Sequence, residues 1–278
     1  MMIAVASGKG GSGKTLIATS LALALDEELT FLDCDVEEPN SAIFLKPEIE
    51  EEEKVYKLVP SVDYEKCNFC AKCEEVCAYN AIVVVKEKVM IFPELCHSCG
   101  ACSASCPTTA IREEGQEMGI IRRGKRERIE FYEGELKVGE PMATPLIRRV
   151  KSKRRELTIT IVDCPPGTSC PVMESVRGSD YILLVTEDTP FGLNDLEMAL
   201  DTFGEMGMQI RRMGVIINKS LERGEIEEFC KAEGIEVLMH LPLDREIARS
   251  YSEGRPLLQY KEEFKSLYRR INETDSCD

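Results

Sequence analysis

Gly8-Lys9-Gly10-Gly11-Ser12-Gly13-Lys14-Thr15 is the stretch that decides the fold of this chain. It matches the phosphate-binding pattern G-x-x-x-x-G-K-[ST] and stands where that pattern requires, between an apolar strand pattern at 2–7 and a helical pattern at 15–28. Glycines let backbone N–H groups curl around phosphates, and the start of the following helix adds a favourable dipole. We expect Lys14 to bridge the β- and γ-phosphates of a nucleotide and the Thr15 hydroxyl to bind Mg²⁺.

Alternating strand and helix patterns extend outward from this loop. Apolar runs predict buried strands at 29–35, 157–167, 181–187, 213–219 and 237–242. Helical patterns lie between them at 145–156, 194–206 and 225–234. This order predicts an α/β P-loop fold with a mainly parallel sheet flanked by helices.

A cysteine-rich segment interrupts the alternation. The acidic run EIEEEEK at 48–54 marks its start, and short strands at 118–124, 127–134 and 135–140 are expected to return the chain as a hairpin. We therefore predict two domains. They are a P-loop domain formed by residues 1–55 and 114–278, and an inserted α+β domain at 56–113.

The inserted segment contains two runs of the form C-x2-C-x2-C-x3-C, at 67–77 and 96–106. In a reducing cell, cysteines at this spacing indicate metal ligands. Zn²⁺ also binds C-x2-C pairs and is the alternative, but two identical four-cysteine runs favour two [4Fe–4S] clusters. The predicted ligands are Cys67, Cys70, Cys73, Cys77, Cys96, Cys99, Cys102 and Cys106.

The composition narrows the class of protein. The 278 residues carry a formal charge of −15, which repels nucleic-acid phosphates, and 43% of them are apolar, enough to bury a core. The opening MMIAVASGKGG lacks the features of an export signal, and no run approaches the ~18 apolar residues of a membrane span. We expect a cytoplasmic protein with no nucleic-acid partner and no membrane span.

Lys9 gives the loop the pattern KGGxGKT, which resembles the deviant Walker A motif of the MinD/ParA/Mrp family of P-loop ATPases. In that family the extra lysine reaches across an ATP-sandwiched dimer to the partner's phosphates, as an arginine finger does. DCDVEEPN at 33–40 resembles the family's switch I, and implies that Asp35 orients the attacking water and that Asp33 lies near Mg²⁺. Strand-end aspartates could instead serve as caps.

Two further segments carry the same resemblance. ITIVDCPPG at 159–167 resembles Walker B and switch II, and GVIIN at 214–218 ends on the equivalent of an adenine-reading asparagine, with HLPLD at 240–244 lining the base. The implied catalytic residues are Lys9, Lys14, Asp35 and Asp163. The implied ligands of the nucleotide are Gly8, Gly10, Gly11, Ser12, Gly13, Lys14, Thr15, Gly167, Asn218 and Pro242, and those of Mg²⁺ are Thr15 and Asp33.

The cysteine runs resemble a bacterial two-cluster ferredoxin, in which the fourth cysteine of each run ligates the other cluster. The resemblance implies one cluster on Cys67, Cys70, Cys73 and Cys106, and a second on Cys96, Cys99, Cys102 and Cys77. The sequence departs from the family at Ala78, where proline is usual, which affects the rigidity of the loop and not ligation.

Three other features leave alternatives open. Among the remaining cysteines, Cys34, Cys164, Cys230 and Cys277 are expected to be inert, whereas Cys170 stands at the offset of a ligand cysteine of the nitrogenase iron protein. Basic segments at 122–128 and 148–155 are solvated faces or a docking patch for an acidic partner. The helical stripe at 260–271 is expected to pack on the main domain and not to bind a membrane.

The resemblance implies an ATP-hydrolysing iron–sulfur protein that dimerises with a second copy or with a paralogue. Its nucleotide state would be coupled to cluster-mediated electron transfer, or to metallocofactor or iron–sulfur assembly, on a client metalloprotein or redox partner. One alternative is a MinD/ParA-like positioning ATPase with redox-sensing clusters. Another is a plain ferredoxin whose ATPase part only regulates docking.

Overall fold

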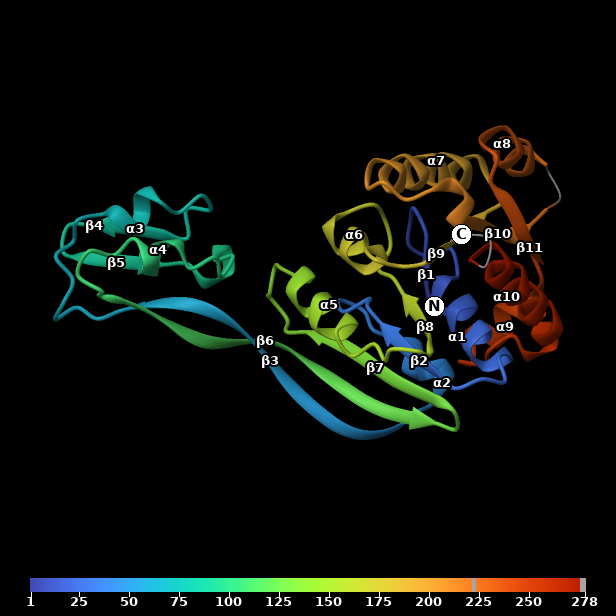
Figure 1. Ribbon diagram of the computed structural model, residues 1–278, viewed down its shortest axis with the longest axis horizontal. Helices are drawn as coiled ribbons and strands as arrows, with labels where there is room; N and C mark the ends of the chain where they lie inside the picture. The colour runs from blue at the N-terminus through green and yellow to red at the C-terminus, as the bar shows by residue number, and fades with distance from the viewer. Residues whose placement is uncertain (222–223, 276–278) are drawn as a thin grey trace. The chain divides into compact units, whose positions relative to one another are not determined.

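The computed structural model describes residues 1–221 and 224–275, which form two compact units (Figure 1). The main unit comprises Met1–Glu52, Ile121–Glu135 and Ala143–Asp278, and the inserted unit comprises Glu53–Ile120 and Leu136–Met142. In the part of the chain that the structure describes, no helix is long and apolar enough to cross a membrane.

A nine-stranded sheet organises the main unit, in the order β11-β10-β9-β1-β8-β2-β7-β6-β3. The strand pairs from β11 to β7 are all parallel, and β1, β2 and β8 are buried along their whole length. An α/β fold with a mainly parallel sheet is therefore confirmed. The strands are β1 Met2–Ala6, β2 Leu29–Asp33, β3 Glu48–Val62, β6 Ile111–Arg126, β7 Ile129–Leu136, β8 Ile159–Asp163, β9 Tyr181–Glu187, β10 Met213–Ser220 and β11 Glu236–Pro242.

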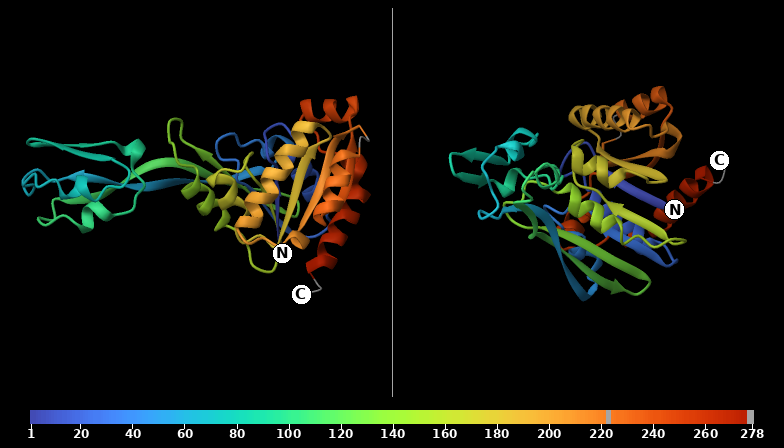
Figure 2. Two further views of the ribbon diagram at one scale, coloured as in Figure 1. Left: turned by 90° about the horizontal axis from the view of Figure 1, so that it is seen from above. Right: turned by 60° about the vertical axis from the view of Figure 1, so that its left-hand side comes forward.

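Helices cover both faces of this sheet (Figure 2). Helix α1 packs on α10, and α5 packs on α6. The helices are α1 Lys14–Ala24, α2 Ser41–Leu45, α5 Thr144–Lys151, α6 Cys170–Val176, α7 Pro190–Glu205, α8 Glu225–Glu233, α9 Arg245–Ser252 and α10 Lys261–Asp275, with 3-10 turns η2 Ile210–Arg212 and η3 Leu258–Tyr260. In α10 the side chains of Phe264, Leu267 and Ile271 are buried in the core, so the expected packing of the C-terminal stripe is confirmed.

The acidic run at 48–54 lies in a strand and is not a simple linker. It occupies the first half of β3, where Glu52 pairs with Arg122, Glu51 with Arg123, and Lys54 with Glu117 of the neighbouring strand. Opposite charges on adjacent strands stabilise the pairing. Arg122 and Arg123, the first two arginines of the predicted basic segment at 122–128, thus lie in ion pairs within the sheet.

The predicted three short strands at 118–140 were partly wrong. Residues 118–124 belong to the 16-residue strand β6, and β7 covers 129–136, but 137–140 form a turn. In that turn the Lys137 N–H donates to Met118 O at 2.9 Å and the Glu140 N–H donates to Lys137 O at 2.9 Å. These bonds end the strand, which the local sequence pattern did not indicate.

The inserted unit consists of loops held by short elements. Strands β4 Ile82–Val85 and β5 Lys88–Ile91 form an antiparallel hairpin, and α3 Lys72–Glu75, η1 Pro93–Leu95 and α4 Ala101–Ala104 lie in or beside the cysteine runs. The two runs share unusual backbone angles at three matched positions. Left-handed φ values occur at Phe69 and Ala71 in the first run and at Ser98 and Gly100 in the second, and again three residues after each run, at Asn80 and Thr109.

Candidate functional sites

The phosphate loop borders a cavity of about 440 Å³ in the main unit. This volume suits a nucleotide-sized ligand. The loop turns between β1 and α1, and Lys14 at the start of α1 is 94% buried, its relative exposure being 6%. Of the predicted site residues, Gly10, Gly11, Gly13, Lys14, Thr15, Asp35, Asn218 and Pro242 line the cavity.

Two buried aspartates lie side by side behind the cavity. Asp33 and Asp163 end the neighbouring parallel strands β2 and β8 in register, and neither is exposed to solvent. Burial, followed by the repulsion of Asp163, raises the pKa of Asp33 well above its usual range, and burial likewise raises the pKa of Asp163. Two carboxylates in this position favour a cation between or beside them.

The Asp33 side chain holds switch I by accepting hydrogen bonds from backbone N–H groups of that segment. Asp33 Oδ1 accepts the Asp35 N–H at 3.1 Å, and Oδ2 accepts the N–H groups of Asn40 at 3.2 Å and Ser41 at 3.0 Å. Both oxygens of Asp33 are thus engaged in shaping the loop that carries Asp35. The residue was predicted as a magnesium ligand, and this geometry suits it better to positioning.

The second aspartate keeps an oxygen available. Asp163 Oδ2 accepts the Ser41 hydroxyl at 3.0 Å, whereas Asp163 Oδ1 is buried without a hydrogen-bond partner in residues 1–221 and 224–275. The Thr15 hydroxyl and the Lys14 ammonium lower the pKa of the same carboxyl group and so partly offset the effect of burial. An unsatisfied buried carboxylate oxygen next to a threonine hydroxyl fits a hydrated Mg²⁺ ion.

Asp35 projects into the cavity from the switch I loop. Burial raises its pKa to about 7, Asp163 adds to the rise, and Lys14 opposes it. A carboxylate with a pKa near neutrality can accept a proton from, or orient, an attacking water.

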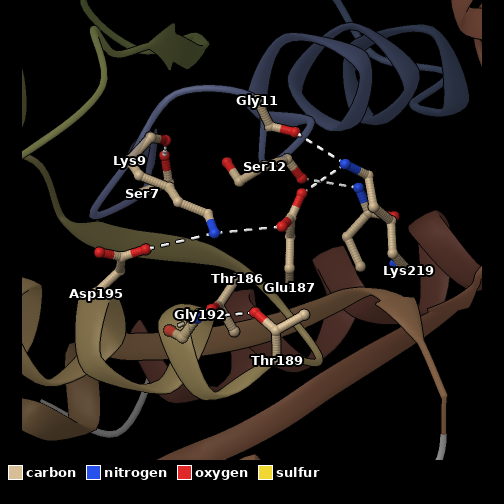
Figure 3. A network of polar contacts seen from close by, with 11 residues as sticks. Ser7, Lys9, Gly11, Ser12, Thr186, Glu187, Thr189, Gly192, Asp195 and Lys219 are labelled. Carbon is tan, nitrogen blue, oxygen red and sulfur yellow. Dashed lines mark hydrogen bonds and ion pairs between the residues drawn. The ribbon is translucent and has the colours of Figure 1, made fainter.

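Asn218 and its neighbour tie β10 to the phosphate loop. The Asn218 side-chain amide donates to Ser12 O at 2.7 Å, and its oxygen accepts the Lys219 N–H at 2.9 Å. Lys219 Nζ donates to Gly11 O at 3.2 Å and pairs with Glu187 (Figure 3). Asn218 therefore holds the loop in addition to lining the cavity.

Switch II is closed onto the phosphate loop. The Gly167 N–H, expected to sense the γ-phosphate, donates to Ser7 O at 3.0 Å. That hydrogen bond has to break before the N–H can contact a phosphate.

Lys9 points away from the cavity into an acidic cradle. Its Nζ lies 3.2 Å from Glu187 Oε2, at the end of β9, and 3.6 Å from Asp195 Oδ2, in α7 (Figure 3). The lysine side chain is still 32% exposed, so these pairs are weak enough to exchange for a stronger anion.

The sequence did not predict the roles of Glu187, Asp195 and Lys219, because only the fold brings them to the loop. Ser41, directly after the switch I motif, could have been found.

The eight cysteines surround two separate cavities in the inserted unit. Cys67, Cys70, Cys73 and Cys106 line one, and Cys77, Cys96, Cys99 and Cys102 line the other. Each quartet takes three cysteines from one run and the fourth from the other. In the described chain no three metal-binding side chains converge on a single ion.

Backbone N–H groups point at several of these sulfurs. Cys77 Sγ accepts the Ala81 N–H at 3.3 Å, and Cys106 Sγ accepts the Ala110 N–H at 3.2 Å. Such bonds stabilise thiolates and are the usual surroundings of iron-bound sulfur. The residues present therefore fit a cluster in each quartet. Beside the second quartet the His97 ring stacks on that of Tyr79, with the ring centroids 3.5 Å apart.

The remaining predicted features take ordinary positions. Cys34, Cys164 and Cys230 are buried, Cys170 is exposed at the start of the short helix α6, and Cys277 lies outside the described residues. In the segment at 148–155, Arg148 pairs with Glu174 and Arg155 pairs with Glu130, so part of this charge is also internally matched.

Comparison with known proteins identifies relatives along most of the chain. It is 36% identical to an uncharacterised protein of Methanocaldococcus jannaschii over 207 residues, 73% of each chain. It is 25% identical to the cytosolic Fe-S cluster assembly factor NUBP2 of Rattus norvegicus, over 93% of this chain and 84% of that protein. The structure resembles the cell division ATPase MinD of Pyrococcus furiosus with a TM-score of 0.57 at 17% identity, covering 98% of both chains, a likeness of fold.

The family match spans the same region as the nucleotide cavity. Residues 3–257 match the family described as the CobQ/CobB/MinD/ParA nucleotide binding domain. This range contains the phosphate loop, both switch segments and the inserted cysteine runs. The chain therefore belongs to the CobQ/CobB/MinD/ParA family of nucleotide-binding proteins.

Proposed function

We propose that the chain is a Mg²⁺-dependent ATPase whose inserted unit carries two [4Fe–4S] clusters in a ferredoxin-like arrangement, and that its nucleotide state controls electron delivery to a partner protein. The observation that carries the proposal is the sorting of eight cysteines into two interleaved quartets, in a chain that also has a phosphate loop bordering a nucleotide-sized cavity.

The nucleotide site divides its tasks among three groups of residues. The loop glycines would surround the phosphates with N–H groups, Lys14 would neutralise the β- and γ-phosphates, and Thr15 with the free oxygen of Asp163 would hold hydrated Mg²⁺. Asp35 would orient the attacking water. Asn218, which also holds the phosphate loop, and Pro242 line the cavity and would contact the base.

Dimerisation would complete this site. Lys9 is held by Glu187 and Asp195 in the single chain, and the phosphates of a second chain would replace these carboxylates as its partners. The exchange would replace two partly exposed ion pairs with contacts to a more highly charged anion, in an interface from which more water is excluded. The partner chain would be a second copy or a paralogue, as the family resemblance implies.

The quartets favour clusters that stay with the protein. A [4Fe–4S] cluster supplies one-electron redox chemistry at low potential. Four cysteines from two separate runs enclose each cavity, so releasing a cluster would require both runs to open. This arrangement supports an electron carrier more than a donor of clusters.

Iron–sulfur or metallocofactor assembly on a client is the second candidate. It is supported by the similarity along 93% of the chain to a protein named as a cytosolic Fe-S cluster assembly factor. A positioning ATPase with redox-sensing clusters is less well supported, because the apolar face of α10 is buried and the net charge of −15 repels nucleic acid and anionic lipid. Transfer of iron to an apo-protein in the presence of ATP would favour assembly over electron delivery.

The ligand assignment is tested by substituting cysteines of the same quartet that lie in different runs. After anaerobic reconstitution we expect about eight iron atoms per chain, four for each cluster. Cys67→Ser and Cys106→Ser should alter the same electron paramagnetic resonance (EPR) signal, although they lie in different runs, and Cys96→Ser should alter the other. Cys230→Ala, in α8, is the control and should alter neither. If Cys106→Ser instead reproduced Cys96→Ser, the interleaved assignment would be wrong.

Coupling is tested by recording the EPR spectrum and the cluster potentials without nucleotide, with MgADP and with a non-hydrolysable Mg·ATP analogue. Nucleotide-dependent spectra or potentials are expected if ATP controls the clusters. Identical behaviour in all three states would refute the coupling and leave an ATPase and a ferredoxin that act independently.

A further inference from the structure

Helix α2 lies in the main unit, just before β3, one of the two strands that lead into the inserted unit (Figure 1). It comprises only Ser41–Leu45, directly follows switch I, and is separated by two residues from the start of β3 at Glu48. Phe44 and Leu45 are buried in the core of the main unit. A helix this short depends on contacts at its ends, because it has few internal hydrogen bonds.

The first end of α2 is held by the two aspartates behind the cavity. Asp33 Oδ2 accepts the Ser41 N–H, and Asp163 Oδ2 accepts the Ser41 hydroxyl, both at 3.0 Å. The other oxygen of Asp163 is the one left without a partner in the described residues. Since both oxygens belong to one carboxylate, a cation that reorients it must alter the bond to Ser41.

The cavity also contacts the helix from the side. The ring of Phe44 lies 5.7 Å from that of Tyr251, and Tyr251 lines the cavity together with Asn40, the residue before α2. Occupation of the cavity therefore acts on α2 at its start and on one flank.

Arg126 holds the other end of α2. It is the last residue of β6, and its Nη1 donates to Leu45 O at 2.6 Å and to Phe44 O at 3.2 Å. These are C-terminal carbonyls that the helix leaves unsatisfied, and a guanidinium there also complements the helix dipole. Strand β6 approaches β3 closely at the same place, since a Cβ on Gly124 would lie 2.6 Å from Glu48 O.

Both strands then continue to the cysteine runs. At the far end of β3, the Leu58 carbonyl accepts the Ser98 hydroxyl at 2.6 Å, beside Cys96. Strand β6 begins at Ile111, directly after the loop in which Cys106 Sγ accepts the Ala110 N–H. Both contacts lie in or after the second run, but they reach different quartets: β3 reaches the quartet that contains Cys96, and β6 the quartet that contains Cys106.

We propose that α2 couples the nucleotide site to the cysteine quartets, and that Arg126 is the positioning residue that fastens this helix to β6. The inference rests on the proposed function, since it gives the route by which nucleotide state would reach the clusters. Displacement of α2 moves β3 through the chain and β6 through Arg126, so both strands shift together. Without Arg126, β6 would follow α2 only indirectly, through its pairing with β3, so its response should be weaker.

Hydrogen–deuterium exchange on the anaerobically reconstituted protein tests the route, with and without a non-hydrolysable Mg·ATP analogue. In the wild type we expect nucleotide to change exchange at 40–46 and also in the loops around Ser98 and Ala110. Arg126→Ala should keep the change at 40–46 and weaken it around Ala110, where only the pairing of β6 with β3 would still transmit it. Its nucleotide affinity should shift by less than about tenfold because Arg126 does not line the cavity. The nucleotide dependence of the EPR signal should weaken in parallel.

Two further variants guard against a simple folding defect. Arg128→Ala is the matched control. Arg128 Nε donates to Leu25 O at 2.8 Å, at the end of α1, so this variant loses a similar hydrogen bond at a different helix. It should respond to nucleotide as the wild type does. Arg126→Lys keeps a charged donor and should restore part of the response.

The outcomes separate the route from the proposed function. A wild type without any nucleotide-dependent change in the cysteine loops would refute the proposed coupling and the inference with it. A wild-type response that persists fully in Arg126→Ala would overturn the inference alone. Loss of the response in Arg128→Ala to the same degree would also overturn it, because a general loosening of helix ends would then explain the data.

Discussion

Asp35→Asn is expected to stabilise the nucleotide-free protein while abolishing ATP hydrolysis. The carboxyl group borders the nucleotide cavity, and burial together with the nearby Asp163 raises its pKa from the ordinary 3.8 to about 7, against the opposing effect of Lys14. The ionised form is therefore strained in the folded chain. Asparagine has nearly the same shape and no charge, so it removes this strain and with it the group that would orient water.

The size and direction of the effect follow from the two pKa values. Between about pH 4 and pH 7 the folded chain keeps the proton that the unfolded chain has released, so the free energy of unfolding decreases as the pH rises through this window. A difference of about three pH units corresponds to about 4 kcal/mol at most. Solvent reaches this partly exposed side chain, so we expect about 2 kcal/mol. The cost is complete above pH 7 and absent below about pH 4.

Hydrogen exchange of amides in β1 and β8 provides the assay, because it reports the stability of the main unit without requiring two-state unfolding of the whole chain. Wild type and Asp35→Asn are compared at pH 5 and pH 8 without nucleotide. The variant should gain less than about 1 kcal/mol at pH 5 and about 2 kcal/mol at pH 8. Glu38→Gln, an exposed carboxylate on the rim of the same cavity, is the control; its repulsion is only a minor cause of the raised pKa of Asp35, so this variant should gain much less than Asp35→Asn at pH 8. An equal gain at both pH values would refute the raised pKa and with it the electrostatic reading of switch I.

Two further predictions concern packing and buried charge. Gly8→Ala would place a Cβ 2.1 Å from the backbone oxygen of Asp195 and should destabilise the main unit by about 2–3 kcal/mol, whereas Gly10→Ala, whose nearest neighbour lies 4.0 Å away, should cost less than about 1 kcal/mol in the same exchange assay. In the inserted unit, the buried Lys57 Nζ lies 2.8 Å from the Glu140 carboxylate, so Lys57→Met should cost about 3–5 kcal/mol by leaving that charge unpaired. The double variant Lys57→Met/Glu140→Leu should recover most of this loss. If urea denaturation of the inserted unit showed the single and the double variant to be equally unstable, the explanation would be contradicted.

The sequence determined the main α/β fold because its signals are local. The phosphate loop stands between an apolar strand and a helix, and the order of the strands that follow allows few arrangements other than a parallel sheet. The predicted strand at 181–187 coincides with β9. The spacing of apolar residues at 260–271 likewise predicted which side chains of α10 are buried.

The contacts that shape the candidate site could not be predicted in the same way. The ion pairs of Lys9 with Glu187 and Asp195 join β9 and α7 to a loop more than a hundred residues earlier. The hydrogen bond of Arg126 joins β6 to α2, a helix on the other side of the insertion. No local pattern marks such partners. The turn after β7 was also missed, since it depends on a hydrogen bond from the Lys137 N–H to Met118 O, in the preceding strand β6, and not on a local sequence pattern.

The matched left-handed residues of the two cysteine runs have a consequence for the ancestry of the inserted unit. Phe69, Ala71 and Asn80 have their counterparts in Ser98, Gly100 and Thr109, so the two halves repeat one backbone path and not only one spacing of cysteines. Each half lends its fourth cysteine to the other half's cavity. A single half by itself could complete a quartet only by pairing with a second copy. Fusing two copies in tandem makes that encounter intramolecular and independent of concentration, which is the advantage a duplication at this site would have offered.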